Sequence, residues 1–431
     1  MQFGLFYEHQ LPKPWGEEAE YRLYQEALEQ VEVADRIGMD MLWEVEHHFL
    51  EEYSHSSAPE VFLGACSQRT RRIRLGHGIA LMPPAYNHPA RVAERIATLD
   101  LVSHGRVEWG TGESASLMEM EGFGINPPEK TAMWREATEQ AANMLAMRPY
   151  PGFKGEYFEM PCRNLVPKPL QRPHPPAWVA CSKRETIHRA ARNGLGALAF
   201  AFVEPEMAAK WVQEYYDIIK SEECVPLTHT VNPNIALVSG MMCHPDAEEA
   251  VARGLDGFKF FGYSLGYFGI YGEIKPGYTD IWSRYMEVRD TLEDNAGRGG
   301  IGTPEQVRQH LLRYERAGVD QIIFVKQSGK NRHDHICESL ELFGREVLPE
   351  FAERDAARQV KKQEALAPYI AAALARKPRM APLAEADVPV LIAPGRRSAA
   401  VGDARRTAFA DRALPIPATD PHAKLAKVQS D

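Results

Sequence analysis

Short apolar runs alternate with amphipathic segments along most of the chain. Runs of mostly apolar residues bounded by turn residues predict strands of a parallel sheet, and they fall at 2–7, 39–46, 73–82, 106–112, 177–181, 196–202, 234–243 and 320–325. Apolar residues spaced three and four apart predict helices, and these segments fall at 19–38, 59–70, 89–103, 129–147, 302–318 and 335–351. Because strand and helix patterns alternate, the chain is expected to be built of β-α units.

Eight such units predict an α/β fold, a (β/α)8 TIM barrel with insertions over residues 1–351. An open, doubly wound sheet produces the same alternation and stays an alternative on the pattern alone. One insertion, at about 254–300, is rich in glycine and aromatic residues. Residues 352–431 form a C-terminal extension, which begins as a charged, alanine-rich helix and continues as an irregular arm. We expect this extension to be an arm and not a domain.

Composition narrows the classes of partner. The chain has 431 residues, with 50 basic against 59 acidic side chains and a net charge of −9. This balance argues against nucleic acid or an anionic membrane surface as the main partner. The six cysteines are scattered, without a C-x-x-C pair, which favours reduced thiols in a cytoplasmic protein. No basic leader precedes an apolar core and no run of 18 apolar residues occurs, so we expect neither a signal peptide nor a membrane span.

Polar and titratable residues follow the predicted strands at the end where a barrel carries its active site. They are Glu8 and His9 after the first strand, Glu46 and His47 after the second, Gly112 and Glu113 after the fourth, and Cys181 and Ser182 after the fifth, with Met82 after the third. Convergence of such groups on one mouth is expected of an enzyme.

The stretch WEVEHHF, residues 43–49, contains the strongest candidate for chemistry. Neighbouring side chains on a strand point to opposite faces, so at most one of His47 and His48 faces the interior. His47 could act as a general acid or base, bind a metal, or simply lie half exposed at a strand end. Adjacent histidines do not readily chelate one ion, and the other histidines show no known metal spacing, so no metal-ligating residue is predicted.

A second candidate is the stretch ACSKRET, residues 180–186, which joins the fifth strand to a helix. Ser182 and Glu185 have the spacing of a capping box. A helix start offers backbone N–H groups and a positive dipole, to which Lys183 and Arg184 add charge. The pattern fits either a phosphate site or a plain helix cap.

Three further stretches have two interpretations each. WGTGES, residues 109–114, permits close backbone approach to a flat or phosphorylated ligand, or forms a tight turn. GHGI, residues 76–79, indicates a bulge or unusual peptide geometry at the mouth, or a glycine where neighbours crowd. Residues 260–271 contain six aromatic side chains, which form either a packed flap or a lid over an apolar substrate pocket.

Taken together and in order, several motifs resemble one family, the bacterial luciferase-like flavin-dependent monooxygenases. They are WEVEHHF, NHPARVAERIATLDLVSHGRVEWGTG and the closing GTPEQV…AGVDQIIF…ICESLELFGREVLPEF, and the resemblance covers about residues 1–351. It implies the barrel and a two-component oxygenase, in which a separate NAD(P)H-dependent flavin reductase supplies reduced FMN. Dioxygen then gives a flavin hydroperoxide that oxidises an organic substrate in a dry cavity. The aromatic insertion favours a small or medium apolar substrate. The resemblance also implies a homodimer that pairs through the helices near the second and third strands.

The resemblance assigns roles to individual residues. His47 matches the family's catalytic histidine and Glu46 the acid before it. His77 and Gly78 match the position of a strained, often cis, non-prolyl peptide against the isoalloxazine ring. Ser182 matches a phosphate-binding serine after the fifth strand.

The chain also departs from the pattern. Bacterial luciferase has an arginine that binds the flavin phosphate where this chain has Glu113, and Glu-Ser where it has Cys181 and Ser182. We therefore expect Lys183 or Arg184 to meet the phosphate charge. Light emission with an aldehyde is not implied, and the extension after 351 has no counterpart in luciferase.

Three alternative functions stay open. The same scaffold hosts oxidoreductases that use a deazaflavin coenzyme and transfer hydride without dioxygen. A non-catalytic flavin-binding barrel, or the partner subunit of a heterodimer, has no need for a titratable histidine at the mouth. A metal-dependent hydrolase predicts bound zinc or manganese.

Overall fold

The computed structural model describes residues 1–293 and 296–392. The chain divides into two compact units, Met1–Pro382 and Leu383–Asp431. In the second unit, the described residues contain one short 3-10 helix, Glu385–Asp387. Within the described part of the chain, no helix is long and apolar enough to cross a membrane.

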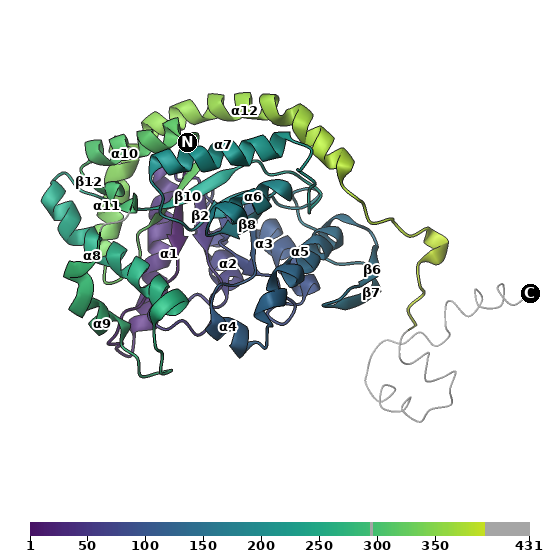
Figure 1. Cartoon of the computed structure of the whole chain (residues 1–431), viewed down its shortest axis with the longest axis horizontal. Coiled ribbons are helices and arrows are strands. Elements are labelled where there is room, and N and C mark those ends of the chain that lie inside the picture. The colour runs from purple at the N-terminus through teal and green to yellow at the C-terminus, as the bar shows by residue number, and fades with distance from the viewer. Residues whose placement is uncertain (294–295, 393–431) are drawn as a thin grey trace, which may run out of the picture. The chain divides into compact units, whose positions relative to one another are not determined.

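The first unit is built on a closed ring of parallel strands (Figure 1). In chain order the ring contains β1 (Gln2–Tyr7), β2 (Met41–Glu44), β3 (Arg74–His77) with β4 (Ala80–Leu81), β5 (Val107–Gly112), β8 (Ala177–Cys181), β9 (Gly196–Ala199), β10 (Ile235–Gly240) and β13 (Gln321–Val325). β1 pairs with both β2 and β13, and β3 pairs with β5, so no edge is left open. The prediction of a (β/α)8 TIM barrel is confirmed, and the open doubly wound sheet is excluded.

Helices surround the strands. They are α1 (Ala19–Ile37), α2 (Pro59–Arg69), α3 (Pro89–Val102), α5 (Lys130–Ala146), α6 (Arg184–Arg192), α7 (Pro205–Lys220), α8 (Ala247–Gly266), α10 (Pro304–Arg316) and α11 (His333–Glu346). Local sequence fixes their starts: Pro89 opens α3, and Thr303 caps α10 in a capping box with Gln306, which satisfies N–H groups that the helix itself cannot pair.

The connections contain further elements. They are α4 (Leu117–Gly122), the antiparallel hairpin β6 (Tyr150–Lys154) and β7 (Glu159–Arg163), the parallel pair β11 (Met242–Cys243) and β12 (Ile301–Gly302), α9 (Ile281–Val288), a π-helix (Tyr267–Tyr271) and the 3-10 segments Pro127–Glu129, Arg289–Thr291 and Ala296–Gly300. The aromatic stretch 260–271 is therefore helical, since it begins in α8 and ends in the π-helix.

Side chains fill the barrel below its mouth. Because successive residues of a strand face opposite sides, Leu5 packs outward against the helices while Phe6 packs inward. The rings of Trp43 and Trp178 meet edge to face inside the barrel, with centroids 5.2 Å apart. The Trp43 indole N–H donates to Gln321 at 2.8 Å, so its burial leaves no unpaired donor. These large rings close the lower barrel and leave the ligand cavity at the C-terminal ends of the strands.

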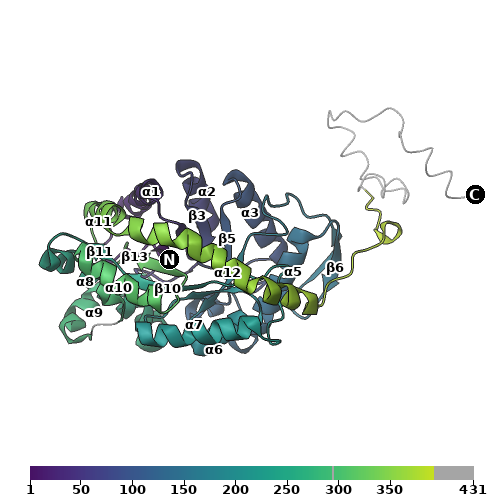
Figure 2. The same cartoon turned by 90° about the horizontal axis from the view of Figure 1, so that it is seen from above.

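A long helix, α12 (Leu348–Arg376), belongs to the same unit and lies beside α7 and α11 (Figures 1 and 2). It is tied to the barrel by the buried carboxylate of Asp320, which lies 2.9 Å from Lys362 Nζ and 3.2 Å from Arg358. The other oxygen of Asp320 accepts hydrogen bonds from the Tyr216 hydroxyl at 2.5 Å and the Ile235 N–H at 3.0 Å. Because Asp320 precedes β13 and Ile235 begins β10, α12 covers the end of the barrel opposite its mouth. Residues 393–431 of the predicted arm lie outside the described residues.

Candidate active site

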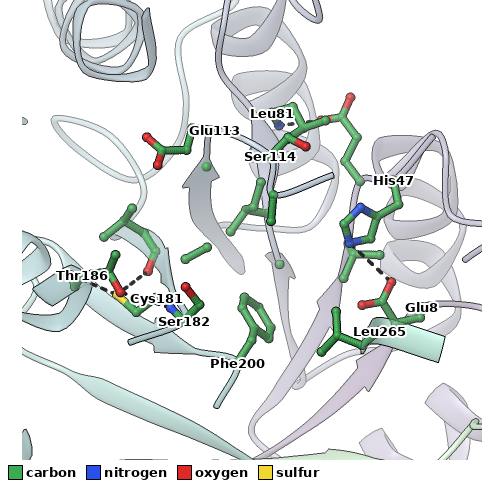
Figure 3. A pocket seen from close by; sticks show the side chains of 18 of the residues that line it. Glu8, His47, Leu81, Glu113, Ser114, Cys181, Ser182, Thr186, Phe200 and Leu265 are labelled. Atoms are coloured by element: carbon green, nitrogen blue, oxygen red, sulfur yellow. Dashed lines mark hydrogen bonds and ion pairs between the residues drawn. The ribbon is translucent and has the colours of Figure 1, made fainter. Parts of the chain in front are cut away.

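A cavity of about 240 Å³ opens at the C-terminal ends of the barrel strands (Figure 3). Its wall is mostly apolar. Its apolar and aromatic lining residues include Phe6, Val45, Tyr53, Ile79, Leu81, Trp134, Val179, Ala180, Phe200, Val238, Phe261 and Leu265. The charged lining residues are Glu8, Glu46, His47, Glu113, Lys130 and Arg189. Charged groups set into an apolar wall indicate a ligand or reaction site.

His47 lies between two carboxylates. Its Nδ1 is 2.8 Å from Oε1 of Glu119, and its Nε2 is 3.7 Å from Oε2 of Glu8. Burial disfavours the charged ring, but the negative charges of Glu8 and Glu119 outweigh it and raise the pKa of His47 to about 9. His47 is therefore held as an imidazolium at neutral pH.

Glu119 comes from α4, a helix that the sequence pattern did not predict. Its carboxylate accepts hydrogen bonds from the Ser114 hydroxyl at 2.6 Å and the His48 backbone N–H at 2.9 Å, besides its contact with His47. Burial raises the pKa of Glu119, but the charge of His47 and these donors prevail and lower it. Glu119 is thus the anionic partner that orients the His47 ring.

Glu8 follows β1 and is buried. Its Oε1 accepts a hydrogen bond from the Tyr53 hydroxyl at 2.8 Å. Burial raises the pKa of Glu8 to about 7, although the positive charge of His47 opposes this rise. The Glu8–His47 pair therefore changes its charge within the range from neutral to mildly alkaline pH.

The other residues of these two strand ends face elsewhere. The carboxylate of Glu46 reaches the rim of the cavity, where it accepts from the Leu81 N–H at 2.6 Å and from Asn87 at 2.8 Å. It thereby holds β4 in place and does not contact His47. His48 packs on the ring of Phe123, with centroids 4.9 Å apart, outside the cavity lining.

His9 turns away from the cavity, and its Nε2 lies 2.9 Å from the buried carboxylate of Glu44. Of the two residues after β1, it is Glu8 that lines the cavity. Over residues 1–293 and 296–392, no group of three or more His, Cys, Asp or Glu side chains is arranged to hold a metal ion.

The break between β3 and β4 places Gly78 in the cavity lining, but the imidazole of His77 points into a separate small recess with Glu46 and Asn87. Cis peptide bonds in the described residues occur only before prolines, so the expectation of a cis bond between His77 and Gly78 is wrong. A trans bond is the ordinary state of a non-prolyl peptide. The Gly78 N–H donates to the Glu44 carbonyl at 2.6 Å, which bends the chain without a cis bond.

The opposite side of the cavity is formed by the ends of β5 and β8, with Glu113, Ser182 and Thr186 (Figure 3). Arg189 of α6 reaches this side, and its guanidinium lies 3.4 Å from Glu113 and stacks over the ring of Trp134 at 5.1 Å. Its Nε is buried without a hydrogen-bond partner among the described residues. Arg189 was not predicted from the sequence, and it supplies the positive charge that Glu113 does not.

The start of α6 differs from the predicted capping box. The helix begins at Arg184, and it is the hydroxyl of Thr186 that accepts from the backbone N–H groups of Ser182 and Lys183, both at 3.1 Å. Arg184 is half exposed and paired with Glu214. Burial raises the pKa of the Cys181 thiol to about 12, so that it stays neutral.

Of the predicted cofactor-binding residues, the cavity brings together Gly78, Gly112, Glu113, Cys181 and Ser182. The side chains of His77, Lys183 and Arg184 do not line it.

Comparison with known proteins places this site in a family. The family model described as luciferase-like monooxygenase matches residues 1–321. The chain belongs to the luciferase-like monooxygenase family. The prediction of a flavin-dependent monooxygenase is therefore confirmed at the level of the family.

Individual relatives agree with this placement. The chain is 25% identical to the oxygenase component of the flavin-dependent trigonelline monooxygenase of Acinetobacter baylyi over 366 residues, which cover 82% of this chain and 96% of the relative. It superposes on the monooxygenase RslO1 of Streptomyces bottropensis with a TM-score of 0.65 and 25% identity, over 81% of this chain and 100% of that one. An F420-dependent secondary alcohol dehydrogenase shares the fold, with a TM-score of 0.60 and 20% identity over 80% of this chain and 98% of that one.

In this luciferase-like monooxygenase the cavity thus has two ends of different character. At one end lies the cationic His47 with its two carboxylates, and at the other lie Arg189 and Lys130 beside the start of α6. An apolar wall connects them, so a flat ligand with an anionic tail can reach both ends at once.

Proposed function

We propose that the protein is a two-component monooxygenase that uses reduced FMN and dioxygen to oxidise a small or medium apolar organic molecule, with an NAD(P)H-dependent reductase as the source of reduced FMN. The observation that carries this proposal is the position of His47 between Glu8 and Glu119 at the wall of an apolar cavity. The relative from Acinetobacter baylyi, an oxygenase component, supports the need for a reductase. A homodimer stays a prediction from the resemblance.

The cationic side chains and the apolar wall of the cavity support FMN as its ligand. The buried, unpaired Nε of Arg189 is a donor suited to a phosphate, and Lys130 lines the same part of the cavity. Gly112 lets the side chain of Ile79 pack against β5, because a Cβ there would lie 2.4 Å from Ile79 Cδ1. The apolar residues around it offer a flat ring system a face free of competing hydrogen bonds.

The residues of the chain then have separate tasks. Reduced FMN supplies the electrons with which dioxygen is activated. His47 keeps a proton at Nε2 beside the reacting region, and Glu119 fixes the orientation of the ring through Nδ1. The apolar wall excludes water, which would otherwise consume reduced oxygen species before the substrate reacts.

The test is a rapid-mixing experiment in which anaerobic protein with reduced FMN meets oxygenated buffer. We expect the visible absorbance of oxidised FMN to return at least about tenfold more slowly than for free reduced FMN, because the cavity shields the reacting oxygen. Return at the rate of free FMN, with and without candidate substrates, would contradict the proposal.

The alternative is a deazaflavin-dependent oxidoreductase. It is supported by the fold that the chain shares with an F420-dependent dehydrogenase. Titration of reduced FMN and of reduced F420 into the same protein separates the two. Tighter binding of F420, with hydride transfer in the absence of dioxygen, would favour this alternative.

Replacement of Arg189 by glutamine should weaken FMN binding about tenfold or more while leaving riboflavin, which lacks the phosphate, within about threefold, since a charge-assisted hydrogen bond to phosphate is lost. The matched variant Arg184→Gln should leave both affinities within about twofold, because Arg184 pairs with Glu214 and lies outside the cavity lining. Fluorescence titration of the two flavins measures all four values. An equal loss for FMN and riboflavin would remove Arg189 from the phosphate site.

A further inference from the structure

The carboxylate of Glu8 has one oxygen without a hydrogen-bond partner. Oε1 is engaged by the Tyr53 hydroxyl at 2.8 Å. Oε2 is buried and accepts no hydrogen bond from any described residue. The nearest cationic atom, Nε2 of His47, lies 3.7 Å away, which is longer than a hydrogen bond. The side chain of Glu8 is only 3% exposed, and it faces the cavity (Figure 3).

The other acidic residues of the cavity lining have partners. Glu46 accepts hydrogen bonds from the Leu81 N–H and from Asn87. Glu113 pairs with Arg189 at the other end of the cavity. Among the acidic side chains that line the described cavity, Glu8 alone therefore offers a buried acceptor oxygen without a partner.

Aromatic rings line the same cavity as this oxygen. Tyr53 and Phe261 lie with ring centroids 5.8 Å apart, and Phe6 packs 5.1 Å from Phe200 and 6.2 Å from Phe261. All four rings and Leu265 line the cavity. An acceptor left unpaired in such surroundings costs free energy, which a ligand recovers if it donates a hydrogen bond there.

The charge of the neighbouring His47 restricts the donor. An ammonium group placed at Oε2 would also lie close to His47, whose Nε2 is 3.7 Å from that oxygen. Like charges at close range repel strongly in a partly buried site. A neutral hydroxyl donates the same hydrogen bond without this repulsion.

We propose that Glu8 is a specificity-determining residue whose Oε2 accepts a hydrogen bond from a neutral hydroxyl group of the substrate, so that the substrate class is an apolar alcohol or phenol. The inference rests on the proposed function, because it names the substrate class of the same site. The aromatic rings hold the apolar body of the molecule, and Glu8 sets its orientation relative to His47.

The experiment measures binding without flavin. Three probes that share an ethylphenyl group are titrated into the full chain by calorimetry: 4-ethylphenol, ethylbenzene and 4-ethylbenzylammonium. We expect 4-ethylphenol to bind about tenfold more tightly than ethylbenzene, and more tightly than the ammonium compound. In Glu8→Gln the amide oxygen can keep its bond from Tyr53, while the NH2 group replaces the acceptor. The preference for 4-ethylphenol should then fall to within about threefold of ethylbenzene.

The matched control is Glu121→Gln, which changes an exposed carboxylate of α4 and should keep the full preference. If Glu8→Gln does not fold, 4-ethylanisole gives the same information on the unaltered chain. This probe keeps the oxygen and lacks the hydrogen, so it should lose the preference.

Three results would overturn the inference: equal affinity for 4-ethylphenol and ethylbenzene, tightest binding of the ammonium compound, or an unchanged preference in Glu8→Gln. Because these titrations need neither FMN nor dioxygen, they separate the two proposals. A hydroxyl preference that depends on Glu8, together with FMN reoxidation at the free rate, would retain the subsite and reject the oxygenase.

Discussion

Replacement of His47 by alanine is expected to reduce product formation by about a hundredfold or more, the usual size of an acid–base contribution, while the affinity for reduced FMN stays within about tenfold. The imidazolium lies against Glu8 and Glu119 at one end of the cavity, away from the cationic side chains at the other. Its removal should therefore affect the reaction far more than cofactor binding. Single turnovers with reduced FMN and the best substrate from a screen, followed by mass spectrometry, measure the loss.

The pH dependence provides a second measure of the same residue. With a pKa of about 9, His47 is protonated below that value and loses its proton above it. Product formation that needs the proton should be greatest well below pH 9 and fall to about half of that level near pH 9. The alanine variant should lack this alkaline limb.

The control is His48→Ala, because His48 packs on Phe123 outside the cavity lining. It should keep product formation within about threefold of the unaltered chain. Turnover in His47→Ala equal to that of His48→Ala would remove His47 from the mechanism.

Replacement of Asp320 by alanine should lower the free energy of unfolding by about 3 to 5 kcal/mol, the usual effect of removing one partner of a buried ion pair. The carboxylate is 2% exposed and lies 3.2 Å from Arg358 and 2.9 Å from Lys362. It also accepts from Tyr216 and Ile235. Its loss removes the one carboxylate that these two cations and two donors share beneath α12. Denaturant unfolding followed by circular dichroism measures the change.

Asp217→Ala serves as the matched control. Asp217 is exposed on α7, and its carboxylate accepts a hydrogen bond from Gln213 of the same helix. Its effect should stay within about 0.5 kcal/mol. If the two variants unfold alike, α12 is not held by the Asp320 network.

The pattern of the sequence predicts the barrel because each strand is a short apolar run and each helix has its own periodicity. The predicted strands and helices are present in the structure, although some of them begin or end at other residues than predicted. The stretch 73–82 reads as one strand, but the bend at Gly78 divides it into β3 and β4. The segment near 260 carries too many aromatic residues for a regular amphipathic pattern, and it forms helix because its rings pack on two sides.

The sequence pattern predicts only some of the residues of the site. His47 stands at a strand end, where position alone implies the mouth of a barrel. Glu119 has no such signal, because it lies in a connection of six helical residues and reaches His47 only through tertiary packing. Arg189 lies in a helix whose cavity-facing side depends on the rotation of α6 against β8 and β9. Charge in the sequence points to Lys183 and Arg184, but Arg184 is paired with Glu214 on the outside.

The source of Glu119 has a practical consequence for protein engineering. The two partners of His47 come from different parts of the fold. Glu8 follows a barrel strand, and Glu119 lies on a short helix in a connecting segment. The acidity of the histidine can thus be retuned by exchanging α4 alone, without disturbing the strands. A library confined to α4, residues 117–122, would sample different proton affinities of His47 on unchanged barrel strands.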